Sequence, residues 1–346
     1  MIHSEQYWND VKKTAENIPC LEKLNGSSIL ITGATGMIGS AVTDILLYQN
    51  REKQAGILLY LAGRNKQYMA ERFSGIEINK DYIFVEYDAT QNIRLEVKAD
   101  YIIHGASNAN PALYTKEPVE TILGNIIGLN TLFDLAVKEK AKRLLYISSS
   151  EVYGNKTNAK PYEENDYGFV DILNPRACYP NAKRASENLC VAYAAEYGLE
   201  TVIVRPGHIY GPTITQNDSR ASAQFTWNVM DGHDIVMKSS GMQIRSYCYV
   251  LDCASAILTV LGKGKSGNAY NISNRDSVVS IRMFAEALAR YTGKKIIFEN
   301  PTSVEKAGYN LMSNSSLNAE KLEALGWKAL FDLQEGVKHT VDCLRR

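Results

Sequence analysis

The sequence predicts a doubly wound parallel α/β fold with a smaller C-terminal lobe. Short apolar or β-branched runs alternate with helix-length stretches between residues 28 and 272, and a glycine-rich turn directly follows the first run. Alternation of strand and helix is typical of a parallel sheet that is covered on both faces. The runs expected as strands are Ser28–Thr32, Ile57–Ala62, Tyr82–Tyr87, Tyr101–His104, Arg143–Ser148, Thr201–Arg205 and Ala269–Ile272.

The composition excludes several classes of protein. The chain has 346 residues, enough for one large domain or two closely joined ones, and 45% of them are hydrophobic, which excludes a disordered chain. Its 38 basic and 38 acidic residues cancel, so a strongly cationic nucleic-acid binder is excluded as well. No apolar run approaches the roughly 20 residues of a membrane-spanning helix, and the histidines and cysteines show no metal-ligand spacing. A soluble protein with a small-molecule ligand fits best.

The N-terminal residues and the cysteines indicate a cytoplasmic protein. The first residues lack the basic, apolar and small-residue regions of a signal peptide. The six cysteines are scattered without a C-x-x-C pair, so we expect reduced and mostly packed thiols.

The first expected element is a helix that begins after Ser4, a favourable N-cap residue, and stops before Pro19. We interpret this helix as an accessory for packing or subunit contact. Its apolar side is formed by Trp8, Val11, Ala15 and Ile18.

The first strand is followed by the turn Gly33-Ala34-Thr35-Gly36-Met37-Ile38-Gly39, which opens an amphipathic helix. Glycines allow a tight turn and a close approach of the backbone to a pyrophosphate, and the helix N-terminus offers free N–H groups to the phosphates. The motif therefore predicts a Rossmann-type site for NAD or NADP. The buried face of the helix is expected at Ile38, Val42, Ile45 and Leu46.

The ends of the second and third strands bear on the choice of cofactor. An acidic residue that would hold the ribose of NAD is missing after the second strand, which ends in Ala62-Gly63-Arg64. The guanidinium of Arg64 suits the 2′-phosphate of NADP, and the alternative is a solvated loop residue. Asp88 is a candidate partner for the adenine amino group, and the alternative is turn capping.

Two further segments carry candidate catalytic groups. Tyr179 and Lys183 stand four residues apart at the head of a helix, which puts both side chains on one face. A nearby ammonium and an oxidised nicotinamide both stabilise a phenolate, which makes the tyrosine a usable base at neutral pH. Ser149 follows the fifth strand, at the edge where such sheets present their ligand crevice, although a serine there is also a common helix cap or turn signal.

With these motifs together, the chain resembles the extended short-chain dehydrogenase/reductases, specifically the group of nucleotide-sugar epimerases, dehydratases and decarboxylases. The resemblance covers nearly the whole chain after residue 27 and includes three more stretches. These are Ser149-Ser150-Glu151-Val152-Tyr153-Gly154, residues 205–212 with the letters RPGHIYGP, and residues 245–252 with the letters RSYCYVLD.

The resemblance implies roles for individual residues. It implies a triad of Ser149, Tyr179 and Lys183, with Glu151 as a fourth catalytic side chain; a solvated or capping carboxylate is the alternative for Glu151. For His208, Arg176 and Arg220, structural or surface roles are the alternatives to ligand contact. The implied cofactor-binding residues are Gly33, Thr35, Gly36, Met37, Ile38, Gly39, Arg64, Asp88, Ala89, Ala106, Ser107, Tyr179, Lys183, Pro206 and His208, and the implied substrate-binding residues are Asn108, Arg176, His208, Arg220 and Arg245.

Within the group, the chain is most similar to the UDP-glucuronate decarboxylases. The likeness rests on the stretch from His104 to Asn125, on Arg176-Ala177-Cys178-Tyr179, and on residues 220–225 with the letters RASAQF. It departs from the usual decarboxylase pattern at Ser149, at Pro175, at His208 and at the missing ribose acid near Arg64. Dehydration and 4-epimerisation are the alternative reactions, and a catalytically silent cofactor-binding protein is the alternative from another class.

The expected division of the chain has two parts. Residues 1–205, together with about 246–272, form the dinucleotide-binding domain. Residues 206–245 and 273–346 form the lobe that binds the nucleotide-diphosphate sugar, with an apolar face at Leu317, Leu322, Leu325 and Trp327. The resemblance also implies a homodimer through helices that include residues 125–137 and 182–197.

Overall fold

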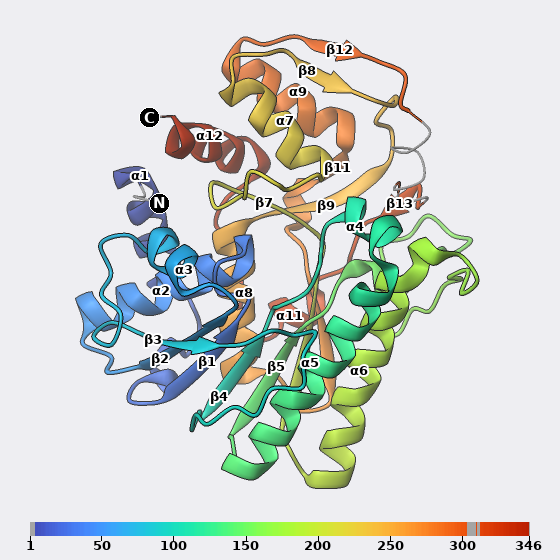
Figure 1. The fold of residues 1–346 in the computed structure, drawn as a ribbon. Coiled ribbons are helices and arrows are strands. Elements are labelled where there is room, and N and C mark those ends of the chain that lie inside the picture. Colours follow the sequence, from blue (N-terminus) through green and yellow to red (C-terminus); the bar gives the residue numbers. More distant parts are fainter. Residues whose placement is uncertain (1–3, 303–308, 310–311, 346) are drawn as a thin grey trace.

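The computed structural model describes residues 4–302, 309 and 312–345. Its centre is a parallel sheet of seven strands in the order β10-β6-β5-β4-β1-β2-β3 (Figure 1). Every predicted strand is present with bounds that differ by at most one residue, which confirms the doubly wound fold. The strands are β1 (Ser28–Thr32), β2 (Leu58–Gly63), β3 (Ile83–Glu86), β4 (Tyr101–His104), β5 (Arg143–Ile147), β6 (Thr201–Pro206) and β10 (Asn268–Ile272).

Helices cover both faces of the sheet, and each face has its own apolar core. One face packs α2 (Met37–Lys53) and α8 (Val250–Lys263), while the other packs α5 (Pro118–Glu139) and α6 (Cys178–Tyr197). The predicted buried face of α2 is confirmed at Val42, Ile45 and Leu46, which are fully buried, whereas Ile38 is partly exposed. The other sides of α2 are also largely buried, because α1 and α8 both pack against it.

The N-terminal helix α1 (Glu5–Ala15) begins at the predicted cap, where Ser4 Oγ accepts a hydrogen bond from Tyr7 N at 3.2 Å. The helix ends at Ala15, and its buried face is more polar than predicted. Tyr7 donates a hydrogen bond to Asp44 of α2 at 2.8 Å, while Asp10 contacts His339 of α12 (Leu333–Leu344) at 2.9 Å. The helix therefore lies between the helix after the glycine turn and the last helix of the chain.

The second lobe is built around β9 (Ile244–Tyr249), a six-residue strand that is almost entirely buried. It pairs with β7 (His208–Tyr210) in parallel and with β11 (Val278–Ser280) in antiparallel orientation, and a parallel pairing with β13 (Asn314–Ser315) completes this sheet. The remaining elements of the lobe are β8 (Ile235–Met237), β12 (Ile296–Phe298), α7 (Ala221–Met230) and α9 (Ile281–Thr292).

The segment after β13 returns to the large sheet. Helix α11 (Glu320–Glu323) lies against β10, and Trp327 Nε1 donates a hydrogen bond to Ser255 Oγ of α8 at 2.8 Å. Leu317, Leu322 and Trp327 are buried, as expected for an apolar face. The division of the chain into two lobes with the bounds given above stays a prediction. Three short helices complete the part that positions the site: α3 (Lys66–Arg72), α4 (Pro111–Lys116) and the 3₁₀ helix η1 (Leu21–Leu24).

Candidate functional site

The glycine turn packs its backbone directly against the end of β4. Gly33 has φ of +70°, and a Cβ atom added there would lie 2.7 Å from the carbonyl carbon of Gly105. A Cβ on Gly39 would lie 2.2 Å from Gly33 O, while Gly36 is the N-cap residue of the 17-residue helix α2. Only glycine allows this close approach, and the turn presents the N-terminus of a long helix at the carboxyl edge of the sheet. The geometry fits the pyrophosphate of a dinucleotide.

Thr32 and His104, a buried pair of side chains, hold the end of β4 beside this turn. Thr32 Oγ1 accepts hydrogen bonds from the backbone N–H groups of Gly105 and Ala106, each at 3.2 Å, and lies 2.7 Å from His104 Nδ1. The Thr32 hydroxyl therefore connects the His104 ring to the backbone that follows β4. Burial lowers the pKa of His104 to about 3, so the ring is neutral. Sequence reasoning assigned no role to this pair.

The other predicted cofactor residues lie at the carboxyl ends of neighbouring strands. Arg64 directly follows β2 and is exposed, whereas Asp88, after β3, accepts hydrogen bonds from the backbone N–H and hydroxyl of Thr90 at 2.9 and 2.8 Å. Ser107 donates a hydrogen bond to Asn125 Oδ1 at 3.1 Å. The turn capping foreseen for Asp88 is thus present. Thr35, Ile38, Ala89, Ala106 and Asn108 are partly buried, and Met37 and Pro206 are buried.

Ser149, Tyr179 and Lys183 meet at the carboxyl end of β5. Ser149 caps the 3₁₀ helix η2 (Ser150–Tyr153), where its Oγ accepts a hydrogen bond from Glu151 N at 3.2 Å. Lys183 Nζ donates to Ile147 O at 2.8 Å and lies 5.6 Å from the centroid of the Tyr179 ring. The predicted four-residue spacing therefore brings the ammonium and the phenol together on one face of α6.

Burial opposes the charged forms of both side chains. It raises the pKa of Tyr179 to about 12, and the negative charge of Glu151 adds to this shift, while hydrogen bonds from Ser149 and Tyr114 and the charge of Arg220 act in the opposite direction. Burial lowers the pKa of Lys183 to about 7. A phenolate at Tyr179 therefore needs additional positive charge beside it.

Glu151 and Arg176 form an ion pair across the entrance to this cluster. Arg176 belongs to the 3₁₀ helix η3 (Pro175–Ala177), and its two terminal nitrogens contact the two Glu151 oxygens at 2.6 and 3.0 Å. Although burial lowers the pKa of Arg176, the hydrogen bonds and the charge of Glu151 raise it overall. The Nε atom of Arg176 is buried and has no hydrogen-bond partner among the described residues. The carboxylate is thus held in place by a forked contact.

Sequence reasoning assigned no role to Tyr114, which lies in α4 between this ion pair and Tyr179. Its ring stacks on the Tyr179 ring with centroids 4.5 Å apart, and the Arg176 guanidinium lies 5.2 Å from the Tyr114 centroid. Tyr114 stands in one of the segments that resemble the decarboxylases, but no spacing within the sequence relates it to Tyr179. Cys178 Sγ donates to Tyr114 O at 3.4 Å, which ties α4 to the start of α6.

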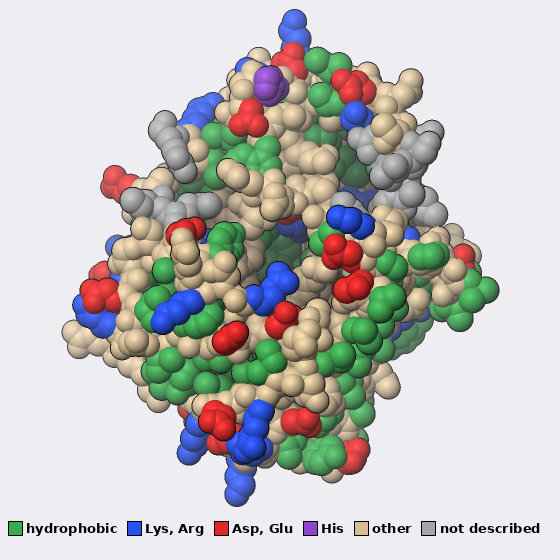
Figure 2. Space-filling model, in the orientation of Figure 1, with side chains coloured by type: hydrophobic (Ala, Val, Ile, Leu, Met, Phe, Trp, Pro, Cys, Tyr) green, Lys and Arg blue, Asp and Glu red, His purple; other side chains and the backbone are tan. Residues whose placement is uncertain are grey.

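Three more predicted substrate residues converge from the second lobe. Arg220 forms a forked contact with Asp218, in which its Nε lies 2.9 Å from Oδ1, and its guanidinium also reaches Met37 Sδ at 3.6 Å. Arg245 is buried, donates to Ile244 O at 2.9 Å, and has no carboxylate partner among the residues that the structure describes. His208 Nδ1 is buried without a partner in the same set, and burial and the charges of Arg245 and Arg220 lower the pKa of His208 well below its ordinary value. Figure 2 shows a hollow at the centre of the molecule with basic side chains in it.

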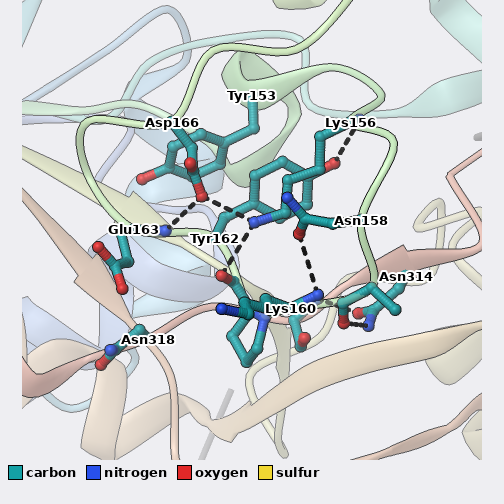
Figure 3. Close-up of polar contacts among 12 residues, drawn as sticks. Tyr153, Lys156, Asn158, Lys160, Tyr162, Glu163, Asp166, Asn314 and Asn318 are labelled. Atoms are coloured by element: carbon teal, nitrogen blue, oxygen red, sulfur yellow. Dashed lines mark hydrogen bonds and ion pairs between the residues drawn. The ribbon is translucent and has the colours of Figure 1, made fainter.

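The loop between η2 and η3 is fastened to the second lobe through Tyr162 (Figure 3). The Tyr162 hydroxyl donates to Gly154 O at 2.7 Å, and its backbone N–H donates to Ser316 O at 2.7 Å. Asn318 N donates to Tyr162 O at 2.9 Å, and Lys156 pairs with Asp166 at 2.7 Å on the outside of the loop. The part of this loop that follows η2 is therefore held against the second lobe.

The chain is similar to known proteins and to solved structures. The model of the NAD dependent epimerase/dehydratase family matches residues 29–273. The chain is 30% identical to UDP-glucuronic acid decarboxylase 1 of Xenopus tropicalis over 94% of this chain and 74% of that protein, and 30% identical to UDP-glucuronic acid decarboxylase 5 of Arabidopsis thaliana over 89% and 86%. Among solved structures it is similar to UDP-glucose 4-epimerase of Thermotoga maritima, with 25% identity, a TM-score of 0.78, and coverage of 91% of this chain and 97% of that one.

Proposed function

The chain belongs to the NAD dependent epimerase/dehydratase family, and from this premise we propose that it is an NAD(P)-dependent enzyme that decarboxylates UDP-glucuronate through a transient 4-ketosugar. The observation that carries the proposal is the placement of Ser149, Tyr179 and Lys183 beside the Glu151 carboxylate, at the sheet edge that also presents the glycine turn. The similarity to the two UDP-glucuronic acid decarboxylases selects this reaction from those of the family.

The glycine turn and the ends of β2 and β3 are the groups that would hold the cofactor. The backbone contacts of Gly33 and Gly39 leave the helix N-terminus free for a pyrophosphate. An exposed Arg64 at the end of β2 suits a 2′-phosphate, which favours NADP at this position. When bound, the cofactor supplies the hydride acceptor for C4 of the sugar.

The proton of the sugar 4-hydroxyl would go to Tyr179 Oη. Its pKa of about 12 has to fall for this step, and the positive charges of Lys183 and of an oxidised nicotinamide both act in that direction. Ser149 Oγ accepts a hydrogen bond from Glu151 N, and its O–H, which interacts with Tyr179 in the structure, would donate to the substrate oxygen once the sugar is bound. The three side chains thus bind, orient and deprotonate the same hydroxyl.

The 4-ketone turns a glucuronate into a β-keto acid, which loses carbon dioxide readily. The charge of the Glu151 carboxylate acts on Tyr179 and raises its pKa. We propose that Glu151 works at C5 of the sugar, the position from which the carboxylate leaves.

Arg245 would bind the diphosphate of the nucleotide sugar. A buried guanidinium without a described carboxylate partner is costly, and a phosphate is the counter-ion that its fork fits best. We propose that Arg220 and His208 also face this anion, because the charges of Arg245 and Arg220 both act on His208.

The protein is further proposed to be a cytoplasmic homodimer that supplies precursors of surface polysaccharides. The support for a dimer is an exposed apolar row on α5, where Val119, Ile122 and Leu123 are 59%, 41% and 45% exposed. All six cysteines are free thiols, as suits a reducing compartment. No helix in the described ranges has the length and apolar character needed to cross a membrane.

The test is mass spectrometry of the products formed from UDP-glucuronate and from a panel of UDP-, dTDP-, GDP- and CDP-hexoses. Loss of carbon dioxide from UDP-glucuronate is the expected result. An unchanged UDP-glucuronate, together with a hexose that loses water or changes configuration, would replace the proposal by dehydration or by the 4-epimerisation that the Thermotoga maritima structure represents.

A Tyr179→Phe variant separates an enzyme from a silent cofactor-binding protein. The loss of the general base is expected to cost about 10²- to 10⁴-fold in rate while cofactor binding persists. Unchanged function of this variant would support the silent alternative.

A further inference from the structure

The Glu151–Arg176 pair joins two 3₁₀ helices that lie 25 residues apart in the chain and flank the catalytic tyrosine. The side chains are 18% and 14% exposed, so the pair is largely removed from water. Sequence reasoning treated Glu151 as a catalytic group and Arg176 as a separate substrate contact. The structure places them in a single unit.

We propose that Arg176 is a positioning residue that acts through Glu151: by cancelling and orienting that carboxylate, it allows a sugar that carries its own carboxylate to bind beside it. This inference rests on the proposed function, since it concerns a uronate substrate. On this proposal, the Glu151–Arg176 pair allows an acidic sugar to bind. A direct contact between Arg176 and the sugar is not required.

The forked geometry is the first argument. Both terminal nitrogens of Arg176 donate to Glu151, at 2.6 and 3.0 Å, so the end-on fork of the guanidinium is filled by this carboxylate. The N–H groups that remain, Nε–H and one on each terminal nitrogen, lie on the other edges of the guanidinium. The backbone of Arg176 is also fixed, because its N–H donates to Asn174 Oδ1 at 3.0 Å as part of a cap.

The second argument is the stack that continues from the pair. The guanidinium lies 5.2 Å from the centroid of the Tyr114 ring, and that ring is parallel to Tyr179 within 10°. A cation–π contact and a stacked pair of aromatic rings each have a preferred relative geometry. Through Arg176 and Tyr114, the position of the Glu151 carboxylate is thereby coupled to the position of Tyr179, the residue proposed to take the sugar proton.

The third argument is electrostatic. Two carboxylates a few ångströms apart repel each other strongly in a site with little water, and a guanidinium paired with one of them removes most of that cost. Of the other nearby cations, Arg220 is held by Asp218, and Arg245 reaches Glu151 only through its longer-range charge. Arg176 is therefore the cation in direct contact with Glu151.

The experiment is a double-mutant cycle measured by calorimetric binding in the Tyr179→Phe background, which prevents turnover. The proteins are the parent and the variants E151Q, R176Q and E151Q/R176Q, each loaded with cofactor, and the ligands are UDP-glucuronate and the neutral UDP-glucose. We expect R176Q to weaken UDP-glucuronate binding about tenfold or more, but UDP-glucose binding by less than about threefold. In the E151Q background, the same substitution should change UDP-glucuronate binding by less than about threefold.

Equal losses of UDP-glucuronate affinity in both backgrounds would overturn the inference, because they would mean that Arg176 contacts the substrate directly. Equal losses for both sugars would overturn it too, in favour of a general structural role. If the parent binds UDP-glucose but not UDP-glucuronate, the proposed function is wrong and this inference fails with it, a result visible before any variant is compared. The matched control is the double variant R282Q/E286Q. Arg282 and Glu286 form an exposed ion pair in α9 with a contact of 2.9 Å, and removing it should leave both affinities unchanged.

Discussion

The ring of Tyr114 lies parallel to that of Tyr179, with centroids 4.5 Å apart and an angle of 10° between the planes. Tyr114 comes from the short helix α4, and Tyr179 from the start of α6. The contact joins the segment that follows β4 to the helix that carries Tyr179 and Lys183. A hydrogen bond from Tyr114 also lowers the pKa of Tyr179. The stacked ring is thus part of the environment that determines when the phenol ionises.

Tyr114→Phe should keep the stack and lose the hydrogen bond. Because that hydrogen bond lowers the pKa of Tyr179, its loss raises this pKa, and the acid limb of the rate profile should move to higher pH. Tyr114→Ala should in addition lower kcat by about ten- to a hundredfold, since the catalytic ring loses its support. The measurement is kcat as a function of pH. Tyr291→Phe, in α9, is the control, and a profile for Tyr114→Phe that coincides with it would contradict the assigned role.

Gly33→Ala should abolish cofactor binding and destabilise the protein, because the new Cβ would lie 2.7 Å from Gly105 C. Gly26 is a matched control, with φ of +69° against +70° at Gly33 and no atom within 4 Å of an added Cβ. Gly26→Ala should cost only about 1–2 kcal/mol of left-handed strain. Cofactor titration and thermal unfolding of the two variants check this, and equal effects would show that close packing at Gly33 is unimportant.

Lys183→Met should stabilise the cofactor-free protein more at pH 6 than at pH 9. Burial lowers the pKa of Lys183 from 10.5 to about 7, so the charged form is disfavoured in the folded state. This destabilisation is complete below pH 7 and fades as the pH rises toward 10.5, where the unfolded chain also loses the proton. Between pH 7 and pH 9 the folded protein has lost this proton and the unfolded chain has not, so we expect the gain to differ by about 2–3 kcal/mol between the two pH values. Denaturant unfolding of both proteins at each pH would measure it, and a gain independent of pH would contradict a charge-based cause.

Glu187→Gln should destabilise the protein by about 3–5 kcal/mol, because it leaves Arg205 buried without its carboxylate. Glu187 Oε2 lies 2.6 Å from Arg205, whose guanidinium also donates to the Tyr153 hydroxyl at 2.9 Å and to Glu164 O at 2.8 Å. A double variant, Glu187→Leu with Arg205→Met, should lose much less, since it removes both charges. Urea unfolding gives the comparison. Equal losses would mean that packing, not the unpaired charge, dominates.

Leu123→Asp should convert the proposed dimer to a monomer. The side chain is 45% exposed in the apolar row on α5, and a charge placed there would have to be desolvated in an interface. Leu58→Asp, at a leucine of β2 that is 43% exposed, is the control and should leave the assembly unchanged. Light scattering after size-exclusion chromatography measures the mass. A monomeric parent, or a dimer that survives Leu123→Asp, would remove α5 from the proposed interface.

The large sheet and the catalytic spacing were predictable because they depend on short-range patterns. Runs such as Ser28–Thr32 and Tyr101–His104 match β1 and β4 residue for residue, since an apolar strand between turn signals is a local property of the chain. Tyr179 and Lys183 share a helix face because the α-helix repeats every 3.6 residues. The glycine turn was equally readable, because the strand before it and the helix after it are contiguous in the chain.

The contacts between segments far apart in the chain were decided by the tertiary structure alone. Arg176 pairs with Glu151 although 25 residues separate the two in the chain, and no periodicity reports that η2 and η3 face each other. The buried face of α1 carries Tyr7 and Asp10 because α2 and α12 offer it Asp44 and His339, partners that only the folded chain assembles. A sequence thus determines which local elements form and which chemical groups they carry, through propensity and periodicity. Which of those groups become partners depends on the packing of the elements, where burial makes every unpaired polar group costly and so selects the arrangement that satisfies them.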